Sequence, residues 1–207
     1  MDKEIIEYVL IGIMFVFIVG LAIVESMRNE KEEKEPEKTE EELERKFLNS
    51  VPDDSNYYNE IKEKNYPIIR KLDKYKPNKE IKVLVGDYMP SSITNTINVL
   101  ESMGIEVDVA KSGVGIIRKI KQGNKYDLII SNNVYDKGNC DGYKTMTMLK
   151  AIKGFNTPVV VLTVSTGQRN EFMSKGWDDY MEKLLTQQQV LNVFTKRIDG
   201  LKFEKIN

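Results

Sequence analysis

Tyr126-Asp127-Leu128-Ile129-Ile130-Ser131-Asn132 is the stretch that decides the fold. It is an apolar run with Lys125 before it and a polar loop after it. The run is too short for a helix of average length. It therefore predicts a strand that is buried on both faces, the kind that lies centrally in a parallel sheet.

Three similar apolar runs lie on either side of this stretch, at residues 81–85, 105–110 and 159–163. The segments between and after them have helical spacing, and they predict helices near residues 91–103, 113–122 and 187–198. Strands that alternate with helices indicate an α/β fold, in which a parallel sheet is covered by helices on both faces. Ligands of such sheets bind where the strands end, so the residues at those ends are the candidate site.

Five segments make residues 81–200 resemble a response-regulator receiver domain, the module that accepts a phosphoryl group on an Asp at the end of its third strand. The segments are Lys82-Val83-Leu84-Val85-Gly86-Asp87-Tyr88, Tyr126-Asp127-Leu128-Ile129-Ile130-Ser131-Asn132, Asp141-Gly142-Tyr143, Pro158-Val159-Val160-Val161-Leu162-Thr163 and Gly176-Trp177-Asp178-Asp179-Tyr180-Met181-Glu182-Lys183. They occur in family order at near-family spacing. The resemblance implies a five-stranded, doubly wound parallel sheet of the flavodoxin-like kind, over a receiver-like domain at residues 81–207.

Two residues depart from the family pattern. Asn132 occupies the place of the phosphoacceptor Asp, and Tyr88 replaces the second of two acidic residues, of which Asp87 remains. In the family these three carboxylates hold Mg²⁺, a cation that prefers several charged oxygens. An Asn amide forms no acyl phosphate, so the nucleophile and most of the metal affinity are missing. We therefore expect a degenerate receiver, or pseudo-receiver, with no enzyme activity, metal or cofactor.

The resemblance also assigns switch roles to three residues. Thr163 matches the hydroxyl that follows the phosphate, Tyr180 the aromatic that changes rotamer, and Lys183 the ammonium that pairs with the phosphate. Each has a structural alternative: Thr163 ends a strand, Tyr180 packs between strand and helix, and Lys183 pairs with Asp87 or Asp136.

Two further features lie near these residues. Leu184 replaces a Pro that the family commonly places after a cis bond, and we expect that bond to be lost. The segment from Thr163 to Tyr180 is short, which predicts a clipped fourth helix beside Trp177. We expect Trp177 to be partly exposed and to serve as a protein contact.

The N-terminus predicts a membrane anchor at residues 1–26. No charge interrupts residues 8–24, and a span over residues 5–24 is long enough to cross a bilayer as one helix. A cleavable signal peptide is the alternative, but a sizeable basic flank and a small-residue cleavage pattern are missing. Only Lys3 precedes the span, whereas Arg28, Lys31, Lys34 and Lys38 follow it. This bias predicts a single-pass protein of the cell membrane whose C-terminal domain is cytoplasmic.

Two segments connect the anchor to the receiver-like domain. Residues 27–50 form a charged linker, in which Thr39 and Glu42 fit a capping box that starts a short helix. Residues 51–80 form a connector that we expect to be helical, because Ile68, Leu72 and Tyr75 recur at helical spacing. Two interpretations remain open: the connector packs on the receiver, or it forms a dimer or partner surface.

Composition limits the function further. With 207 residues and a formal net charge of -1, the chain fits one modest domain with appendages, and nothing indicates nucleic acid binding. Because the chain has no His, His-based metal sites and phosphohistidine transfer within it are excluded. The hypothesis is a membrane-anchored adaptor or regulator that binds a protein partner, with a homodimer as a further candidate. The alternative is a phosphorylatable receiver of two-component-type signalling that uses Asp136 or Asp141 as a displaced acceptor.

Overall fold

The structure is a computed structural model, and it describes residues 39–50, 52–54, 56–64, 71–135 and 141–206. The chain divides into two compact units after Glu44. The predicted span at residues 5–24 lies outside the described ranges. Within those ranges, no helix is both long enough and apolar enough to cross a membrane.

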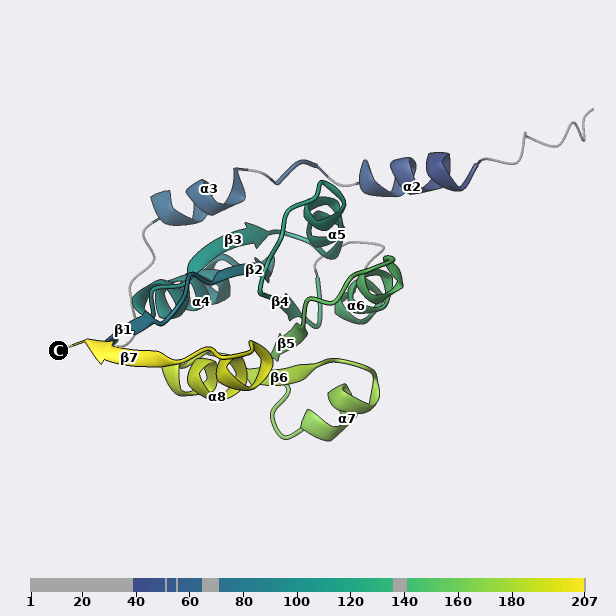
Figure 1. Cartoon of the computed structure of the whole chain (residues 1–207). Coiled ribbons are helices and arrows are strands. Elements are labelled where there is room, and N and C mark those ends of the chain that lie inside the picture. Colours follow the sequence, from purple (N-terminus) through teal and green to yellow (C-terminus); the bar gives the residue numbers. More distant parts are fainter. Residues whose placement is uncertain (1–38, 51, 55, 65–70, 136–140, 207) are drawn as a thin grey trace, which may run out of the picture. The chain divides into compact units, whose positions relative to one another are not determined.

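A five-stranded parallel sheet forms the centre of the second unit, with the strand order β3-β2-β4-β5-β6 (Figure 1). The strands are β2 (Lys82–Gly86), β3 (Glu106–Ala110), β4 (Leu128–Asn132), β5 (Val159–Thr163) and β6 (Asp179–Glu182). Every residue of β4 and of β5 is buried. The predicted doubly wound sheet is thus confirmed. Its central strand, β4, lies within the stretch Tyr126–Asn132.

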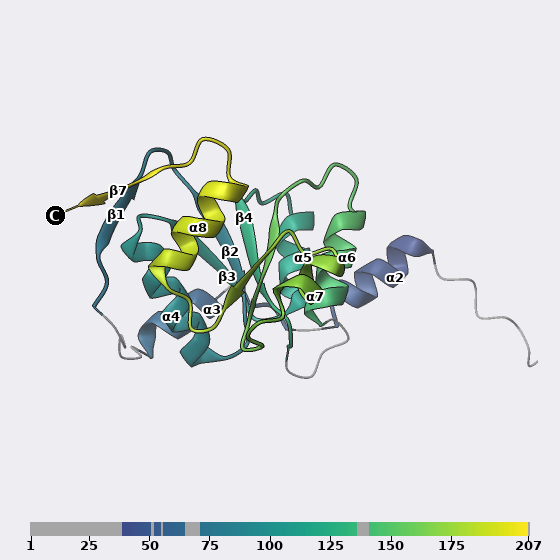
Figure 2. The ribbon, with the colours of Figure 1, turned by 90° about the horizontal axis from the view of Figure 1, so that it is seen from below.

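Helices cover both faces of this sheet, as Figure 2 shows. On one face lie α4 (Pro90–Ser102) and α8 (Gln187–Arg197), and on the other lie α5 (Gly113–Lys121), α6 (Gly142–Ala151) and α7 (Arg169–Ser174). Alternate strand residues face opposite sides: Val83 and Ile130 belong to the α4/α8 core, and Leu84 and Ile129 to the other core. α7 has only six residues, so the fourth helix of the receiver fold is clipped as predicted.

Side-chain caps begin several of the helices that follow the strands. The hydroxyl of Ser112 accepts a hydrogen bond from the N–H of Gly115 at α5, and Asp141 accepts one from Lys144 at α6. Thr186 and Gln189 form a capping box at α8. These caps fix the loops at the carboxyl edge of the sheet, where the candidate site lies.

Part of the connector is a helix, and part of it is a strand. α3 (Tyr57–Glu63) is helical, but Tyr75 lies in β1 (Lys74–Pro77), which pairs antiparallel with β7 (Phe203–Ile206). The helix predicted through Leu72 and Tyr75 is therefore wrong. The reason is that backbone pairing with the distant β7 overrides local side-chain spacing, while residues 65–70, including Ile68, lie outside the described ranges.

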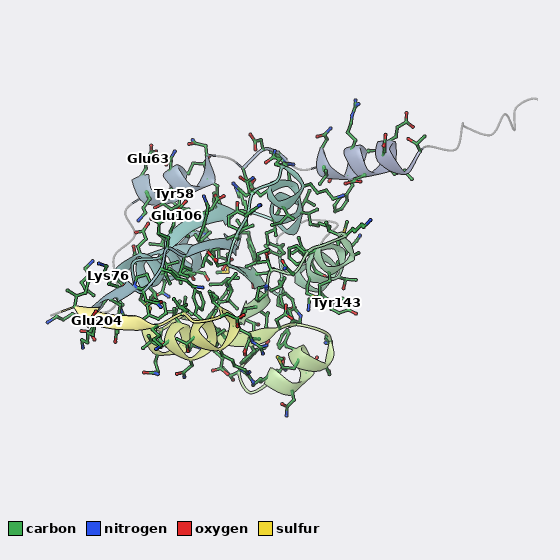
Figure 3. The ribbon with its side chains drawn as sticks, in the orientation of Figure 1. Tyr58, Glu63, Lys76, Glu106, Tyr143 and Glu204 are labelled. Carbon is green, nitrogen blue, oxygen red and sulfur yellow. The ribbon has the colours of Figure 1, made fainter. Side chains whose placement is uncertain are left out.

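α3 packs on the receiver fold. Its Tyr57 and Ile61 are buried in the α4/α8 core, and the helix lies along β3, which is an edge strand of the sheet. Tyr58 and Lys62 both hydrogen-bond Glu101 of α4. Burial, with the Glu101 carboxylate, raises the pKa of Tyr58 to about 12. Figure 3 labels Tyr58 on α3 and Glu106 on β3, two elements that contact each other. Covering the edge strand in this way blocks pairing with another chain.

The chain enters this unit through the end of α2 (Glu40–Leu48), the short helix that the capping box predicts. Phe47 and Leu48 pack against the core on the face of the sheet that α5, α6 and α7 cover, called the α5/α6 core below. Asp54 then lies beside the start of α5. Its carboxylate accepts a hydrogen bond from the N–H of Lys111, just before that helix (2.6 Å). The connector therefore passes beside the carboxyl edge of the sheet before it reaches α3.

Asp179, the first residue of β6, joins this strand to two helices. Its side chain is buried and accepts hydrogen bonds from Arg169 (2.5 Å) and Arg197 (2.7 Å). Burial by itself raises the pKa of Asp179. The hydrogen bonds from Arg197, the Tyr180 N–H and Arg169 outweigh burial, and the pKa lies below its ordinary value.

Candidate functional site

The candidate site lies at the carboxyl edge of the sheet, where the structure brings three of the sequence-predicted residues together. Asp87 directly follows β2, Asn132 is the last residue of β4, and Lys183 directly follows β6. Hydrogen bonds join both Asn132 and Lys183 to Asp87. This set is called the Asp87 pocket below.

The carboxylate of Asp87 accepts four hydrogen bonds. Oδ2 accepts from Lys183 Nζ (2.7 Å) and from the hydroxyl of Ser92 (2.7 Å). Oδ1 accepts from the backbone N–H of Met89 (3.0 Å) and from Asn132 Nδ2 (3.1 Å). A carboxylate offers about four lone-pair sites. Its capacity as an acceptor is therefore taken up by the protein itself.

Asp87 and Lys183 form a buried ion pair, with side-chain exposures of 2% and 6%. Of the two carboxylates that sequence reasoning offered for Lys183, the structure pairs it with Asp87, whereas Asp136 lies outside the described residues. A desolvated pair of this kind is stable only when its remaining polar atoms are also hydrogen-bonded. Ser92, Met89 and Asn132 meet that requirement on the carboxylate side.

Asn132 contributes an N–H donor at a place where the family has a carboxylate. Because a carboxylate only accepts hydrogen bonds, the amide nitrogen of Asn132 must face Asp87. Its Oδ1 accepts from the N–H of Val134 (3.5 Å). An Asp at this position would instead place two anions side by side in a buried pocket. The amide thus fits the pocket as it stands.

Tyr88 contributes a ring, not an oxygen ligand, to this edge. It is partly buried against the α5/α6 core, whereas Asp87 points to the α4 side. Its backbone carbonyl accepts a hydrogen bond from the hydroxyl of Tyr57 in α3 (3.2 Å). Tyr88 therefore helps to fix the connector on the receiver fold.

The oxygens of the Asp87 pocket do not match the donor set that Mg²⁺ prefers. The pocket has one carboxylate, both of whose oxygens already bind protein donors, and one neutral amide oxygen. Across the described residues, no group of three or more His, Cys, Asp or Glu side chains could hold a metal ion. The family's metal site is therefore not reproduced by the residues of this pocket.

Thr163 and Tyr180 both bind the loop after β5. The hydroxyl of Thr163 accepts from the N–H of Ser165 (3.2 Å). The Tyr180 ring is buried, and its centroid lies 5.6 Å from that of the Phe172 ring. Its hydroxyl hydrogen-bonds two acceptors, the carbonyl of Ser165 and Oε1 of Glu182. Burial, together with the Glu182 carboxylate, raises the pKa of Tyr180. The aromatic residue at the family's switch position is therefore held inward.

Trp177 is a core residue, so the prediction of partial exposure is wrong. Its side chain is only 2% exposed and meets Phe172 edge-on, with 6.4 Å between ring centroids. α7 ends at Ser174, and the chain then turns at Gly176, whose φ is 96°. This turn directs Trp177 into the core and not toward solvent.

The peptide bond between Lys183 and Leu184 is cis, although Leu184 replaces the usual Pro. The expectation that this bond is lost is therefore wrong. Tertiary contacts hold the chain on both sides of it. The N–H of Lys183 donates to the carbonyl of Thr163 (2.8 Å), and the carbonyl of the buried Leu185 accepts from Asn95 Nδ2 (3.1 Å).

Of the two displaced acceptor candidates, only Asp141 is described. It is an exposed N-cap, and its Oδ1 accepts a hydrogen bond from the N–H of Lys144 (2.7 Å). This contact explains its position at the start of α6 without a role in the pocket.

Sequence reasoning missed two residues of this edge, Ser92 and Tyr135. Ser92 lies in the first turn of α4, where its hydroxyl reaches Asp87. The buried Tyr135 donates from its hydroxyl to the carbonyl of Gly86 (3.1 Å) and lies 2.8 Å from Ser131 Oγ. A Cβ on Gly86 would meet this hydroxyl at 2.5 Å. The glycine at the strand end was the available signal, since such a glycine often marks a close approach.

Comparisons with known proteins agree with this geometry. A family model for the response regulator receiver domain matches residues 83–195, more than half of the chain. The chain belongs to the response regulator receiver family. It therefore carries a receiver domain of two-component-type signalling, a kind of domain that generally interacts with proteins.

Solved receiver structures share the fold at low sequence identity. The receiver domain of the sensor histidine kinase PA1611 from Pseudomonas aeruginosa PAO1, which has a magnesium ion coordinated in its active-site cleft, is 21% identical with a TM-score of 0.52. That match covers 59% of this chain and 100% of the other. The chemotaxis response regulator CheY4 of Vibrio cholerae is 22% identical with a TM-score of 0.51, over 58% and 100% of the two chains. No curated protein matches the chain at a significant level.

Proposed function

We propose that this protein is a membrane-anchored pseudo-receiver, an adaptor or regulator that presents a constant receiver surface to a protein partner and takes no part in phosphoryl transfer. The observation that carries the proposal is the Asp87 carboxylate with its four protein donors, one of them the amide that stands in the acceptor position.

The first support is the missing nucleophile. Phosphoryl transfer to a receiver joins a carboxylate oxygen to phosphorus, and Asn132 offers an amide at that place. Asp87 is the carboxylate that Asn132 hydrogen-bonds, but its oxygens are occupied by Lys183, Ser92, Asn132 and the Met89 N–H. Attack by Asp87 would require these donors to be released in a buried pocket, which is costly.

The second support is the missing metal site. Mg²⁺ neutralises the charge that develops on a transferring phosphoryl group. Here Lys183 neutralises Asp87 instead, and Tyr88 supplies no ligand. The pocket is thus stable without a cation, and a bound Mg²⁺ would have to displace protein donors.

The third support is the position of the switch residues. Tyr180 is buried and bound to the loop after β5, and Thr163 is bound to Ser165 in the same loop. A receiver signals when these groups rearrange around a phosphate. Without an acceptor no event drives the rearrangement, so the surface formed by α7, β6 and α8 stays in one state.

The anchor is part of the proposal. Its support is the uncharged run at residues 8–24 with basic residues after it, which favours a single span and a cytoplasmic receiver domain. Resistance of the full chain to carbonate extraction from membranes tests the span. Release of the chain into the supernatant would contradict it.

The decisive experiment records amide NMR spectra of the full chain in detergent, with and without Mg²⁺ and beryllofluoride. We expect no saturable shifts at Asp87, Asn132, Thr163 or Lys183. The PA1611 receiver domain serves as a positive control for the reagents, because its structure contains Mg²⁺. Saturable shifts in the Asp87 pocket would overturn the proposal and favour a working receiver.

Acetyl-phosphate treatment followed by mapping of phosphorylated residues tests the displaced-acceptor alternative. We expect no labelled Asp. The matched control variant is Asp141→Asn, which removes the acceptor but keeps an N-capping side chain. Labelling that disappears in this variant would show that Asp141 is the acceptor and that the chain is a phosphorylatable receiver.

A further inference from the structure

Two parts of the connector lie against the receiver fold, residues 52–54 and α3, and together they are called the strap. Arg118 of α5 donates to the carbonyl of Pro52 (3.3 Å), and Asp54 accepts from the N–H of Lys111 just before that helix (2.6 Å). α3 in turn contacts α4 and β3. The strap therefore joins α5 on one face of the sheet to α4 on the other.

The receiver fold leaves room for the strap at α5. A Cβ on Gly115, inside this helix, would meet Oδ2 of Asp54 at 2.3 Å. Glycine lowers the stability of a helix, and the close approach of the carboxylate explains its presence here. The side chain of Asp54 is only 9% exposed, and the guanidinium of Arg118 lies 3.9 Å from its Oδ1. Gly115 and Arg118 thus provide a fitted seat for this part of the strap.

One peptide group, between Tyr88 and Met89, connects the strap with the Asp87 pocket. Its carbonyl accepts a hydrogen bond from the hydroxyl of Tyr57 in α3 (3.2 Å), and its N–H donates to Oδ1 of Asp87 (3.0 Å). The carbonyl and the N–H of a trans peptide belong to one rigid plane and point in opposite directions. The group that holds this carbonyl therefore also sets the direction of the N–H.

The position of α3 fixes the hydroxyl of Tyr57. The ring of Tyr57 is buried, and Nζ of Lys111 lies 5.4 Å from its centroid. Ile61, one helical turn later, is buried in the same core. Between them, Tyr58 hydrogen-bonds the carboxylate of Glu101 in α4. A shift of α3 would therefore move the hydroxyl away from the peptide group that it holds.

We propose that the strap is a conformational control on the Asp87 pocket: seating of α3 aims the Met89 N–H at Asp87, and release of α3 frees this N–H. A hydrogen bond accepted by a peptide carbonyl also strengthens the bond that the N–H of the same peptide donates. Release of α3 therefore weakens one of the four bonds that hold the Asp87 carboxylate. Because coupling of this kind is reciprocal, a disturbed pocket in turn weakens the seating of α3.

NMR spectra of the full chain in detergent, labelled with ¹⁵N-methionine, test the control. Met89→Leu assigns the Met89 amide signal, and the buried Met181 of β6, at the opposite edge of the sheet from β3, shows whether the fold is intact. Tyr57→Phe removes the hydroxyl and keeps the buried ring. We expect the Met89 amide proton to shift upfield in this variant, because its hydrogen bond to the carboxylate weakens, while the Met181 signal stays in place.

The matched control is Tyr58→Phe. It removes a hydroxyl from the neighbouring residue of the same helix, one that bonds Glu101 and not the pocket. We expect the Met89 signal to stay in place in this variant. The comparison separates the link through the Tyr88–Met89 peptide from a general weakening of α3.

A second variant releases the whole helix. Ile61→Asp places a charge at a buried apolar position, and we expect it to detach α3 and to move the Met89 signal upfield as Tyr57→Phe does. Glu63→Lys, a charge change at an exposed residue of the same helix, is its control and leaves the signal in place. Tyrosine labelling shows whether α3 has left its seat, and the milder Ile61→Ser replaces Ile61→Asp where that chain does not fold.

Three results contradict a control through the strap. One is a Met89 signal that does not move in the folded Tyr57→Phe variant. The second is an equal shift in Tyr58→Phe, which would deny the peptide link its special role. The third is a Met89 signal that stays in place after α3 has been released. Neither Mg²⁺ nor beryllofluoride is added, so this control and the proposed function can succeed or fail separately.

Discussion

Replacing Asn132 by Asp restores the acceptor that the family uses, yet we expect it to destabilise this protein. In the native chain, Asn132 Nδ2 lies 3.1 Å from Asp87 Oδ1 and donates a hydrogen bond to it. The variant removes that donor and places a second carboxylate at about the same distance in a buried pocket. Lys183 is the cation that the two carboxylates would then share.

The expected loss of stability follows from these distances. Repulsion between two unit charges at this separation is about 5 kcal/mol at an effective dielectric constant of 20. The lost hydrogen bond to a charged acceptor adds about 2 kcal/mol. Attraction of the new carboxylate to Lys183 offsets more than half of the total, which leaves a net destabilisation of about 3 kcal/mol.

Urea unfolding of the full chain in mild detergent, followed by Trp177 fluorescence, measures this change. Trp177 is the only Trp and is buried, so the signal reports the receiver core. Asn133→Asp is the matched control: the adjacent residue is only half-buried, and we expect a change within about 0.5 kcal/mol.

The pH dependence separates electrostatic repulsion from a packing defect. Repulsion raises the pKa of the new carboxyl group in the folded state above its unfolded value. The loss of stability in Asn132→Asp is therefore full at neutral pH, shrinks as the pH falls below the raised pKa, and disappears near the unfolded value. A variant that is as stable as the native chain at neutral pH would refute the description of Asp87 as a buried carboxylate whose oxygens are fully hydrogen-bonded by the protein.

Three other substitutions test the remaining structure by the same unfolding assay. Lys183→Met leaves a buried carboxylate without its cation, and we expect a loss of about 3 to 5 kcal/mol; a loss below about 1 kcal/mol would contradict the buried pair. Asp179→Asn removes a carboxylate with a lowered pKa, so the loss in free energy of unfolding should be full at neutral pH. This loss should shrink as the pH falls below the ordinary value of 3.8 toward the lowered pKa. A loss that does not change with pH would contradict this. Ile61→Ala should cost about 2 to 5 kcal/mol because α3 is part of the core, whereas Leu43→Ala, at a residue that is 53% exposed, is the control and should cost almost nothing; equal effects would contradict the packing of α3.

The sheet could be predicted because its strands are continuous apolar runs in a chain rich in charge. β4 and β5 are buried on both faces, and such burial leaves an unambiguous pattern. β1 leaves no such pattern, because Lys74–Pro77 is exposed at alternate residues and is a strand only through its pairing with β7. Spacing within a segment cannot reveal a partner that lies at the other end of the chain.

The site could be predicted in part for a similar reason. The positions of Asp87, Asn132 and Lys183 follow from the family resemblance, since each ends or directly follows a strand. Ser92 could not be found in this way, because its contact depends on how α4 leaves the loop after β2. Trp177 was misjudged because its exposure depends on the turn at Gly176, which a shortened helix does not specify.

The substitutions at the site have one physical consequence in common. Three carboxylates at the edge of a sheet repel one another and are stable together only when a cation is bound. With Asn132 and Tyr88 in place of two of them, one carboxylate remains, and Lys183 neutralises it. The buried charge of the Asp87 pocket is therefore balanced by the protein's own side chains, and this balance is what Asn132→Asp would upset.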